Sequence, residues 1–106
     1  MKEKFNFKKF LKENKDKWIY LDHYNDTLKL YNEGVLYVKN FECINGRLAK
    51  IEGTFIQRIT FDDGTCSIMD NEKDTNFMLA KISVEAFNKT EISEELAKET
   101  IERMLP

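Results

Sequence analysis

The fold is decided by residues 18–70, which read WIYLDHYNDTLKLYNEGVLYVKNFECINGRLAKIEGTFIQRITFDDGTCSIMD. Aromatic and β-branched residues are frequent in this stretch, as is typical of strands. Polar or glycine-containing segments that favour turns interrupt it at Asn25-Asp26, Asn32-Glu33-Gly34, Asn45-Gly46 and Asp63-Gly64. We therefore predict a meandering antiparallel sheet of five strands.

A helix is predicted on each side of this sheet. Asn6 can cap the first helix, in which Phe7, Phe10 and Leu11 share a face. Ser93 can cap the last helix, whose predicted buried stripe is Leu96, Ala97, Ile101, Met104 and Leu105. The expected fold class is α+β: one domain over residues 1–106, with an N-terminal helix, a curved antiparallel β-meander of five or six strands, and a C-terminal amphipathic helix.

The segment 77–87 fits two structures. Its apolar residues are compatible with a sixth strand that ends at Val84, and we favour this interpretation. The alternative is a helix in which Met78, Ile82 and Ala86 lie on one face.

Turn chemistry predicts the register. A two-residue loop at Asp63-Gly64 places Phe61 opposite Cys66, and a three-residue loop over 44–46 places Phe41 opposite Ala49. The stretch 47–61 is long for one strand, so we expect it to bend at Gly53.

This register divides the sheet into two faces. The face predicted to form the main core carries Trp18, Tyr20, Tyr24, Tyr31, Val35, Tyr37, Phe41, Cys43, Ala49, Ile51, Phe55, Ile59, Phe61, Cys66 and Ile68. The second face is apolar over Ile19, Leu21, Leu28, Leu30, Leu36, Val38 and Ile56 and polar beyond. It therefore needs a helix or a partner to cover its apolar end.

Composition indicates an ordered domain outside the membrane. The 106 residues are 42% hydrophobic and carry a net charge of −2. No apolar run approaches the roughly 20 residues of a membrane span. The basic N-terminus lacks an apolar segment behind it, so we expect no secretory signal. Two cysteines are too few for a disulfide framework, which makes a cytoplasmic location the expectation.

The sequence contains no motif for catalysis, a cofactor or a metal. The single histidine, His23, is expected on the second face, away from Cys43 and Cys66, which we expect to be buried free thiols. The acidic alternation at Asp70, Glu72 and Asp74 resembles the start of a calcium loop. It lacks the glycine and the closing glutamate of that loop, so we interpret it as an acidic turn.

We therefore expect a non-enzymatic protein-binding module, such as an inhibitor, an immunity protein or an adaptor. It would occupy a partner surface, most simply a basic one, through an acidic loop over 62–74 and a partly apolar sheet face. The predicted partner-binding residues are Asp62, Asp63, Asp70, Glu72, Asp74, Leu36, Val38 and Ile56.

Two other functions stay open. A small ligand or lipid headgroup could occupy a cavity in the curved sheet, lined by Tyr37, Phe41, Ile51, Phe55 and Ile59. Single-stranded nucleic acid could stack on Trp18, Tyr20, Tyr24 and Tyr31, although the acidic net charge disfavours this. A homodimer formed through an edge strand is also left open.

Overall fold

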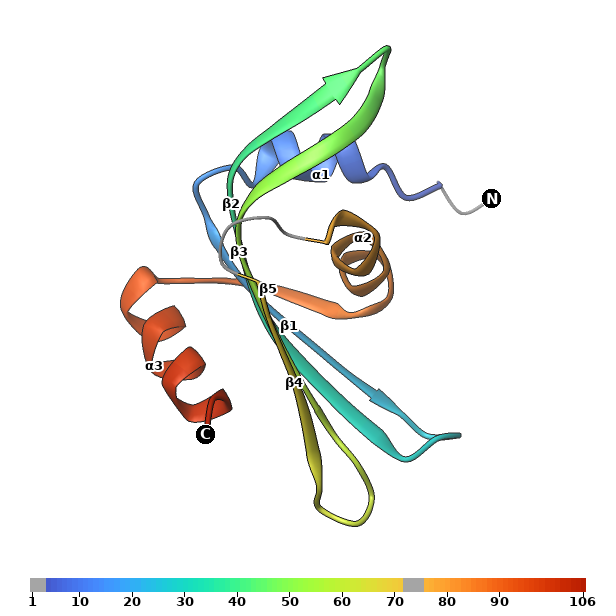
Figure 1. Cartoon of the computed structure of the whole chain (residues 1–106), viewed down its shortest axis with the longest axis vertical. Coiled ribbons are helices and arrows are strands. Elements are labelled where there is room, and N and C mark those ends of the chain that lie inside the picture. Colours follow the sequence, from blue (N-terminus) through green and yellow to red (C-terminus); the bar gives the residue numbers. More distant parts are fainter. Residues whose placement is uncertain (1–3, 72–75) are drawn as a thin grey trace.

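The computed structural model describes residues 4–71 and 76–106 and shows an α+β fold (Figure 1). In chain order its elements are α1 (Phe7–Glu13), β1 (Trp18–Asn25), β2 (Leu30–Ile44), β3 (Arg47–Thr60), β4 (Cys66–Asn71), α2 (Phe77–Ala86), β5 (Asn88–Ile92) and α3 (Glu94–Met104). The five strands form one curved antiparallel sheet, with a helix at each end of the chain. The predicted fold class is confirmed.

The strands lie in the order β4-β3-β2-β1-β5. Strands β1 to β4 form the meander, and β5 returns to the free edge of β1, where Trp18 faces Ile92. Helices α1 and α2 pack on one face of the sheet and α3 packs on the other. These are called here the α1–α2 face and the α3 face (Figure 1).

The main core lies on the α1–α2 face. Its strand residues are Ile19, Leu21, Leu36, Val38, Ile51 and Phe55, and its helix residues are Phe7, Leu11, Ala80 and Val84. A smaller core on the α3 face joins Val35 and Ile56 to Ala97 and Met104. The prediction that the face of Trp18 would form the main core is wrong, because two helices cover the opposite face and only one covers this face.

The predicted turn at residues 32–34 is also wrong, because β2 continues through it. A Cβ atom on Gly34 would lie 3.4 Å from the Phe55 ring, so the glycine leaves room for that side chain. Glu33 is 4% exposed and pairs with Arg103 of α3. Residues that resemble a turn are thus used for close packing and a buried ion pair inside a strand.

The β2–β3 register differs from the prediction. Asn45 and Gly46 form a two-residue turn with φ values of 52° and 77°, and Ile44 faces Arg47. The register shifts twice along the pair, between Val38 and Asn40 and between Glu42 and Cys43. As a result Phe55 lies on the α1–α2 face and Ile56 on the α3 face, the reverse of the prediction.

The β3–β4 register is off by one residue in the opposite direction. Thr60, and not Phe61, faces Cys66. The loop contains one residue more than predicted, because the Phe61 amide donates to the Thr65 carbonyl and Gly64 closes the turn with a φ of 87°. The two errors cancel, so β4 still presents Cys66 on the same face as Trp18.

Residues 77–86 form helix α2, so the preferred strand interpretation is wrong. Asn76 caps the helix by accepting a hydrogen bond from the Leu79 amide at 3.3 Å. Ala80 and Val84 are buried at helical spacing. The helix face that contains Met78, which the helical alternative identified as the apolar one, is exposed to solvent.

The two terminal helices begin at the predicted caps. Asn6 accepts from the Lys9 amide and Ser93 accepts from the Leu96 amide, both at 3.1 Å. The buried stripe of α3 is shifted from the predicted one, because Leu96 is 47% exposed and Thr100 is buried.

Candidate functional site

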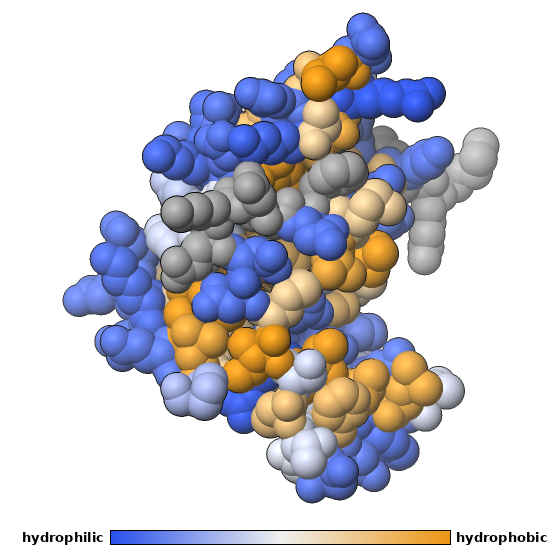
Figure 2. Space-filling model, in the orientation of Figure 1, coloured by the Kyte–Doolittle hydropathy of each residue, from blue (hydrophilic) through white to orange (hydrophobic). Residues whose placement is uncertain are grey.

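One side of helix α2 is apolar and faces solvent. Met78, Leu79 and Ile82 are 53%, 37% and 55% exposed, while Ala80 and Val84 on the other side are buried in the core. Figure 2 shows apolar surface over the position of α2. Large apolar side chains gathered on one exposed helix face are typical of a binding surface. This group of three residues is called here the α2 apolar face.

A groove of about 490 Å³ lies next to the α2 apolar face. It runs between the segment that leads into α1, the β2–β3 turn and α2. Its apolar lining consists of Phe5, Phe7, Leu48 and Met78, and its charged lining consists of Lys4, Lys8, Arg47 and Lys81. None of its described lining residues is acidic. This cationic groove therefore suits an apolar group that carries negative charge.

Two of the predicted acidic residues, Asp62 and Asp63, lie at the far end of the sheet. Asp62 and Asp63 are exposed in the β3–β4 loop, beside Phe61, which is 39% exposed. The Asp63 carboxylate accepts hydrogen bonds from the Thr65 amide at 2.9 Å and the Thr65 hydroxyl at 2.6 Å. These bonds hold the pKa of Asp63 below its ordinary value, so the carboxylate is ionised at neutral pH. We call Phe61, Asp62 and Asp63 the acidic tip.

Of the other predicted acids, Asp70 is exposed near the end of β4. Glu72 and Asp74 lie outside the described residues. The predicted apolar contacts are not at the surface. Leu36 and Val38 are 1% and 2% exposed beneath α1 and α2, and Ile56 is 1% exposed beneath α3. These three residues belong to the core because the helices cover the end of the sheet that sequence reasoning left open.

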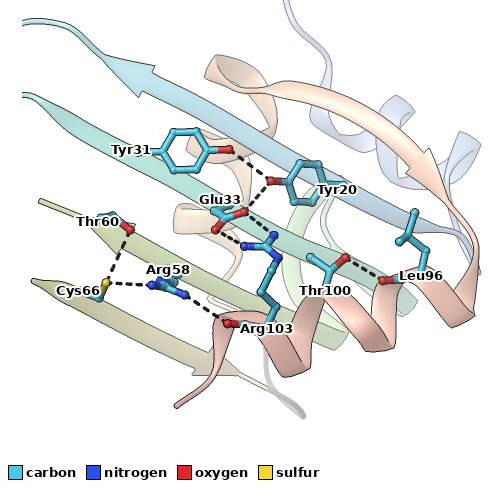
Figure 3. Close-up of polar contacts among 9 residues, drawn as sticks. All are labelled: Tyr20, Tyr31, Glu33, Arg58, Thr60, Cys66, Leu96, Thr100 and Arg103. Carbon is cyan, nitrogen blue, oxygen red and sulfur yellow. Dashed lines mark hydrogen bonds and ion pairs between the residues drawn. The ribbon is translucent and has the colours of Figure 1, made fainter. Parts of the chain in front are cut away.

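A polar cluster joins α3 to the sheet (Figure 3). The Arg103 guanidinium donates two hydrogen bonds to the Glu33 carboxylate, at 3.0 and 2.8 Å. Tyr20 donates to the same carboxylate at 2.6 Å, and its hydroxyl lies 3.4 Å from that of Tyr31. Chiefly because of Arg103, the pKa of Glu33 lies below its ordinary value, whereas burial raises that of Tyr20. Both carboxylate oxygens are occupied, so this cluster positions α3.

A second set of contacts surrounds the Cys66 thiol (Figure 3). Arg58 donates to the sulfur at 3.3 Å, and the Thr60 hydroxyl lies 3.7 Å from it. These two groups lower the pKa of Cys66, with Thr60 the larger influence. Both cysteines are free and exposed, so the prediction that they are buried is wrong.

Cys66 is expected to react with iodoacetamide roughly 3–10 times faster than Cys43 at pH 7, because the thiolate is the nucleophile. Mass spectrometry of peptides after brief labelling measures both rates in one sample. Thr60→Val and Arg58→Gln should each slow labelling of Cys66 and leave that of Cys43 unchanged. Equal rates for the two thiols in the unmodified protein would show that Thr60 and Arg58 do not activate Cys66.

His23 does not form a pair with a thiol. Its ring stacks on Phe87, with centroids 5.2 Å apart and planes at 14°. His23 lies opposite Asn32 on the α1–α2 face, whereas Cys66 lies on the α3 face. The predicted separation of His23 from Cys66 is confirmed.

Most of the side chains predicted to stack nucleic acid or to line a ligand cavity are packed against other parts of the protein. Trp18 stacks on Tyr37 with centroids 4.6 Å apart, and Trp18 and Tyr20 pack against the core beneath α3. On the other face Ile51 and Phe55, predicted to line a cavity, are 1% and 0% exposed because helix side chains fill the concave side.

Comparison with known proteins adds no family: no family model, curated protein or solved structure matches this chain. Within residues 4–71 and 76–106, no three His, Cys, Asp or Glu side chains are grouped to hold a metal ion. The same residues include no helix with the length and apolar character needed to cross a bilayer.

Sequence reasoning missed the α2 apolar face and the cationic groove. The signal for α2 was present, because Asn76 can cap a helix and Ala80 and Val84 are spaced for one buried face. The groove had no such signal. Its lining residues come from three segments, 4–8, 46–48 and 78–81, which only the tertiary fold brings together.

Proposed function

We propose that this chain is a non-enzymatic protein-binding module, of the inhibitor, immunity or adaptor type, that acts by occupying the surface of a partner. The α2 apolar face carries this proposal. Met78 and Ile82 are each more than half exposed, whereas Ala80 and Val84 on the other side of the same helix are fully buried. Covering such side chains contributes about 25 cal/mol per Å² of apolar area removed from water.

Charge supports the proposal. The cationic groove presents four basic residues beside the α2 apolar face, and the acidic tip presents two carboxylates at the far end of the sheet. Surfaces of a single sign raise association rates and select partners of opposite charge. The acidic tip thus suits a partner with a basic docking surface.

The contacts of the potentially reactive side chains support the non-enzymatic part of the proposal. Glu33 is held in an ion pair, and His23 is stacked on Phe87 and separated by the sheet from Cys66. Two free exposed thiols suit a reducing compartment, so we propose a cytoplasmic location.

Site-specific photo-crosslinking in cells of the native host tests the proposal. A photoreactive residue at Met78 should give a discrete adduct with a protein, and one at the exposed Glu102 of α3 should not. Ile82→Asp should remove the adduct, since losing a buried aliphatic contact costs about 1–3 kcal/mol, or roughly 5–150-fold in affinity.

Ile82 is 55% exposed, so Ile82→Asp should change the free energy of unfolding by no more than about 0.5 kcal/mol. Urea denaturation followed by Trp18 fluorescence checks this. If Met78 gives no adduct beyond that of Glu102, or if Ile82→Asp leaves the adduct intact, the α2 apolar face is not the binding surface.

A further inference from the structure

The cationic groove and the acidic tip are complementary in chemistry. The groove combines an apolar floor with Lys4, Lys8, Arg47 and Lys81 at its edges. The acidic tip combines one exposed aromatic ring with two adjacent carboxylates. An apolar floor favours the ring, and ammonium or guanidinium groups favour the carboxylates.

The two surfaces lie at opposite ends of the molecule. The longest dimension of the described chain is 44 Å. In Figure 1 the β3–β4 loop is at the bottom, and α1 and the β2–β3 turn are at the top. A chain therefore cannot place its own acidic tip in its own groove, and the contact requires two molecules.

The acidic tip is ordered before it binds. Phe61 and Thr65 are joined by a backbone hydrogen bond of 2.8 Å, and the Gly64 amide donates to the Phe61 carbonyl at 3.0 Å. The Asp63 carboxylate is fixed by the Thr65 hydrogen bonds, whereas Asp62 forms no ion pair with any described residue. A preformed loop loses little conformational entropy on binding.

We propose that the cationic groove binds the acidic tip of a second copy of this chain, with Phe61 on the apolar floor and Asp62 near Arg47 and Lys81. This inference rests on the proposed function and names the partner. The partner with a basic docking surface, expected for the acidic loop, is then the chain itself.

Such a contact is heterologous, because it joins two different surfaces. Each pairing leaves one groove and one tip free, so further copies add at both ends. The contact is small and partly electrostatic, so it is weak and sensitive to salt.

Sedimentation velocity on the full chain tests this assembly. At low salt the weight-average mass should rise with protein concentration up to about 1 mM and pass beyond that of two chains. Raising the ionic strength from about 0.02 M to 0.5 M should lower the association constant at least roughly tenfold. A protein that sediments as a single chain throughout this range would overturn the proposal.

Two variants locate the contact. Asp62→Lys changes the acidic tip, and Arg47→Glu with Lys81→Glu changes the groove. All three side chains are exposed, so these variants should fold normally. Each variant alone should remain a single chain, because the altered surface then has the same charge as the surface that it would have to bind.

An equal mixture of the two variants should assemble again. The unchanged tip of the groove variant binds the unchanged groove of the tip variant, and the altered tip and altered groove also carry opposite charges. If both variants still assemble alone, or if the mixture stays monomeric, the proposed contact is wrong.

Matched controls keep the charge change and move it elsewhere. Asp26→Lys alters an exposed acid in the β1–β2 loop, at the same end of the sheet as the acidic tip. Lys12→Glu with Lys15→Glu alters two exposed lysines near α1 that do not line the groove. Both controls should assemble within about twofold of the unmodified protein; a control that assembles as poorly as the site variants would show that only overall charge matters.

The crosslinking experiment separates this inference from the proposed function. If the protein is monomeric but still forms an adduct at Met78 with a different protein in cells, the self-assembly proposal is wrong and the proposed protein-binding function stands. Absence of both the adduct and the assembly would remove both proposals.

Discussion

Replacing Gly53 with alanine is expected to prevent folding or to lower the free energy of unfolding by more than about 4 kcal/mol. A Cβ atom at this position would lie 1.9 Å from the backbone oxygen of Tyr37 and 3.0 Å from its carbonyl carbon. These are backbone atoms of the adjacent strand, so they cannot rotate away as the end of a side chain could. The two strands would have to separate at the centre of the sheet.

The location of Gly53 explains the close approach. Gly53 faces Val38, next to the first register shift between β2 and β3. A shift of this kind bends and twists a strand pair. Figure 1 shows the β2–β3 ribbon changing direction along its length, which carries its upper end over the α1–α2 face. Gly53 therefore permits the bend that lets Ile51 and Phe55 share one core with the helices.

Two other glycines provide controls for this prediction. Gly64 has open space around its Cβ position and a φ of 87°, so Gly64→Ala should cost only about 1 kcal/mol. At Gly34 the nearest backbone atom would be 3.2 Å from Cβ, which should give an intermediate loss. Urea denaturation measured by Trp18 fluorescence compares the three variants. A Gly53→Ala protein as stable as Gly64→Ala would show that the strands are not in close contact there.

The bend at Gly53 could be predicted from the sequence because it depends on local properties. A stretch of 15 β-forming residues exceeds the usual length of a strand, and a glycine near its centre is the natural place for a bend. The caps at Asn6 and Ser93 were predictable for the same reason, since each depends on residues within one helical turn.

Features that depend on distant residues were not predictable. Glu33 pairs with Arg103, 70 residues further along the chain, and without that partner the segment 32–34 has the composition of a turn. The predicted registers are wrong because the β2–β3 turn is one residue shorter than predicted and the β3–β4 loop is one residue longer. A one-residue slip moves every side chain to the other face, which is why Ile56 was placed on the wrong face.

In the candidate site too, features that depend on local sequence were predictable, and features that depend on tertiary packing were not. Exposure of Asp62 and Asp63 followed from their position in a turn. Exposure of Met78 and Ile82 did not, because apolar residues are expected inside and only the packing of Ala80 and Val84 shows which side of α2 is buried.

Replacing Arg103 with alanine is expected to lower the free energy of unfolding by about 2–3 kcal/mol at pH 7. The loss arises at Glu33, whose side chain is only 6% exposed. Without Arg103, this buried carboxylate would accept a side-chain hydrogen bond from Tyr20 alone among the described residues. Glu33→Gln should cost less, because the amide keeps the shape of the carboxylate and its oxygen can still accept from Tyr20 and from one Arg103 N–H; the contact with the other Arg103 N–H is lost, since the amide NH2 is itself a donor. Glu102→Ala, at an exposed position on the same helix, should cost under about 0.5 kcal/mol.

The pH dependence of this loss distinguishes the ion pair from simple packing. In the native protein the pKa of Glu33 lies below its ordinary value, which is about 4.3 in an unfolded chain. The ionised carboxylate therefore stabilises the fold above that ordinary value, and this contribution disappears as the pH falls through the lowered native pKa. Without Arg103, burial disfavours the ionised carboxylate, and protonation of Glu33 relieves the variant at low pH. The difference in urea midpoint between the native protein and Arg103→Ala should be largest near pH 7 and shrink towards pH 3. A difference that stays constant over this range would mean that Arg103 acts through its aliphatic stem and not through its charge.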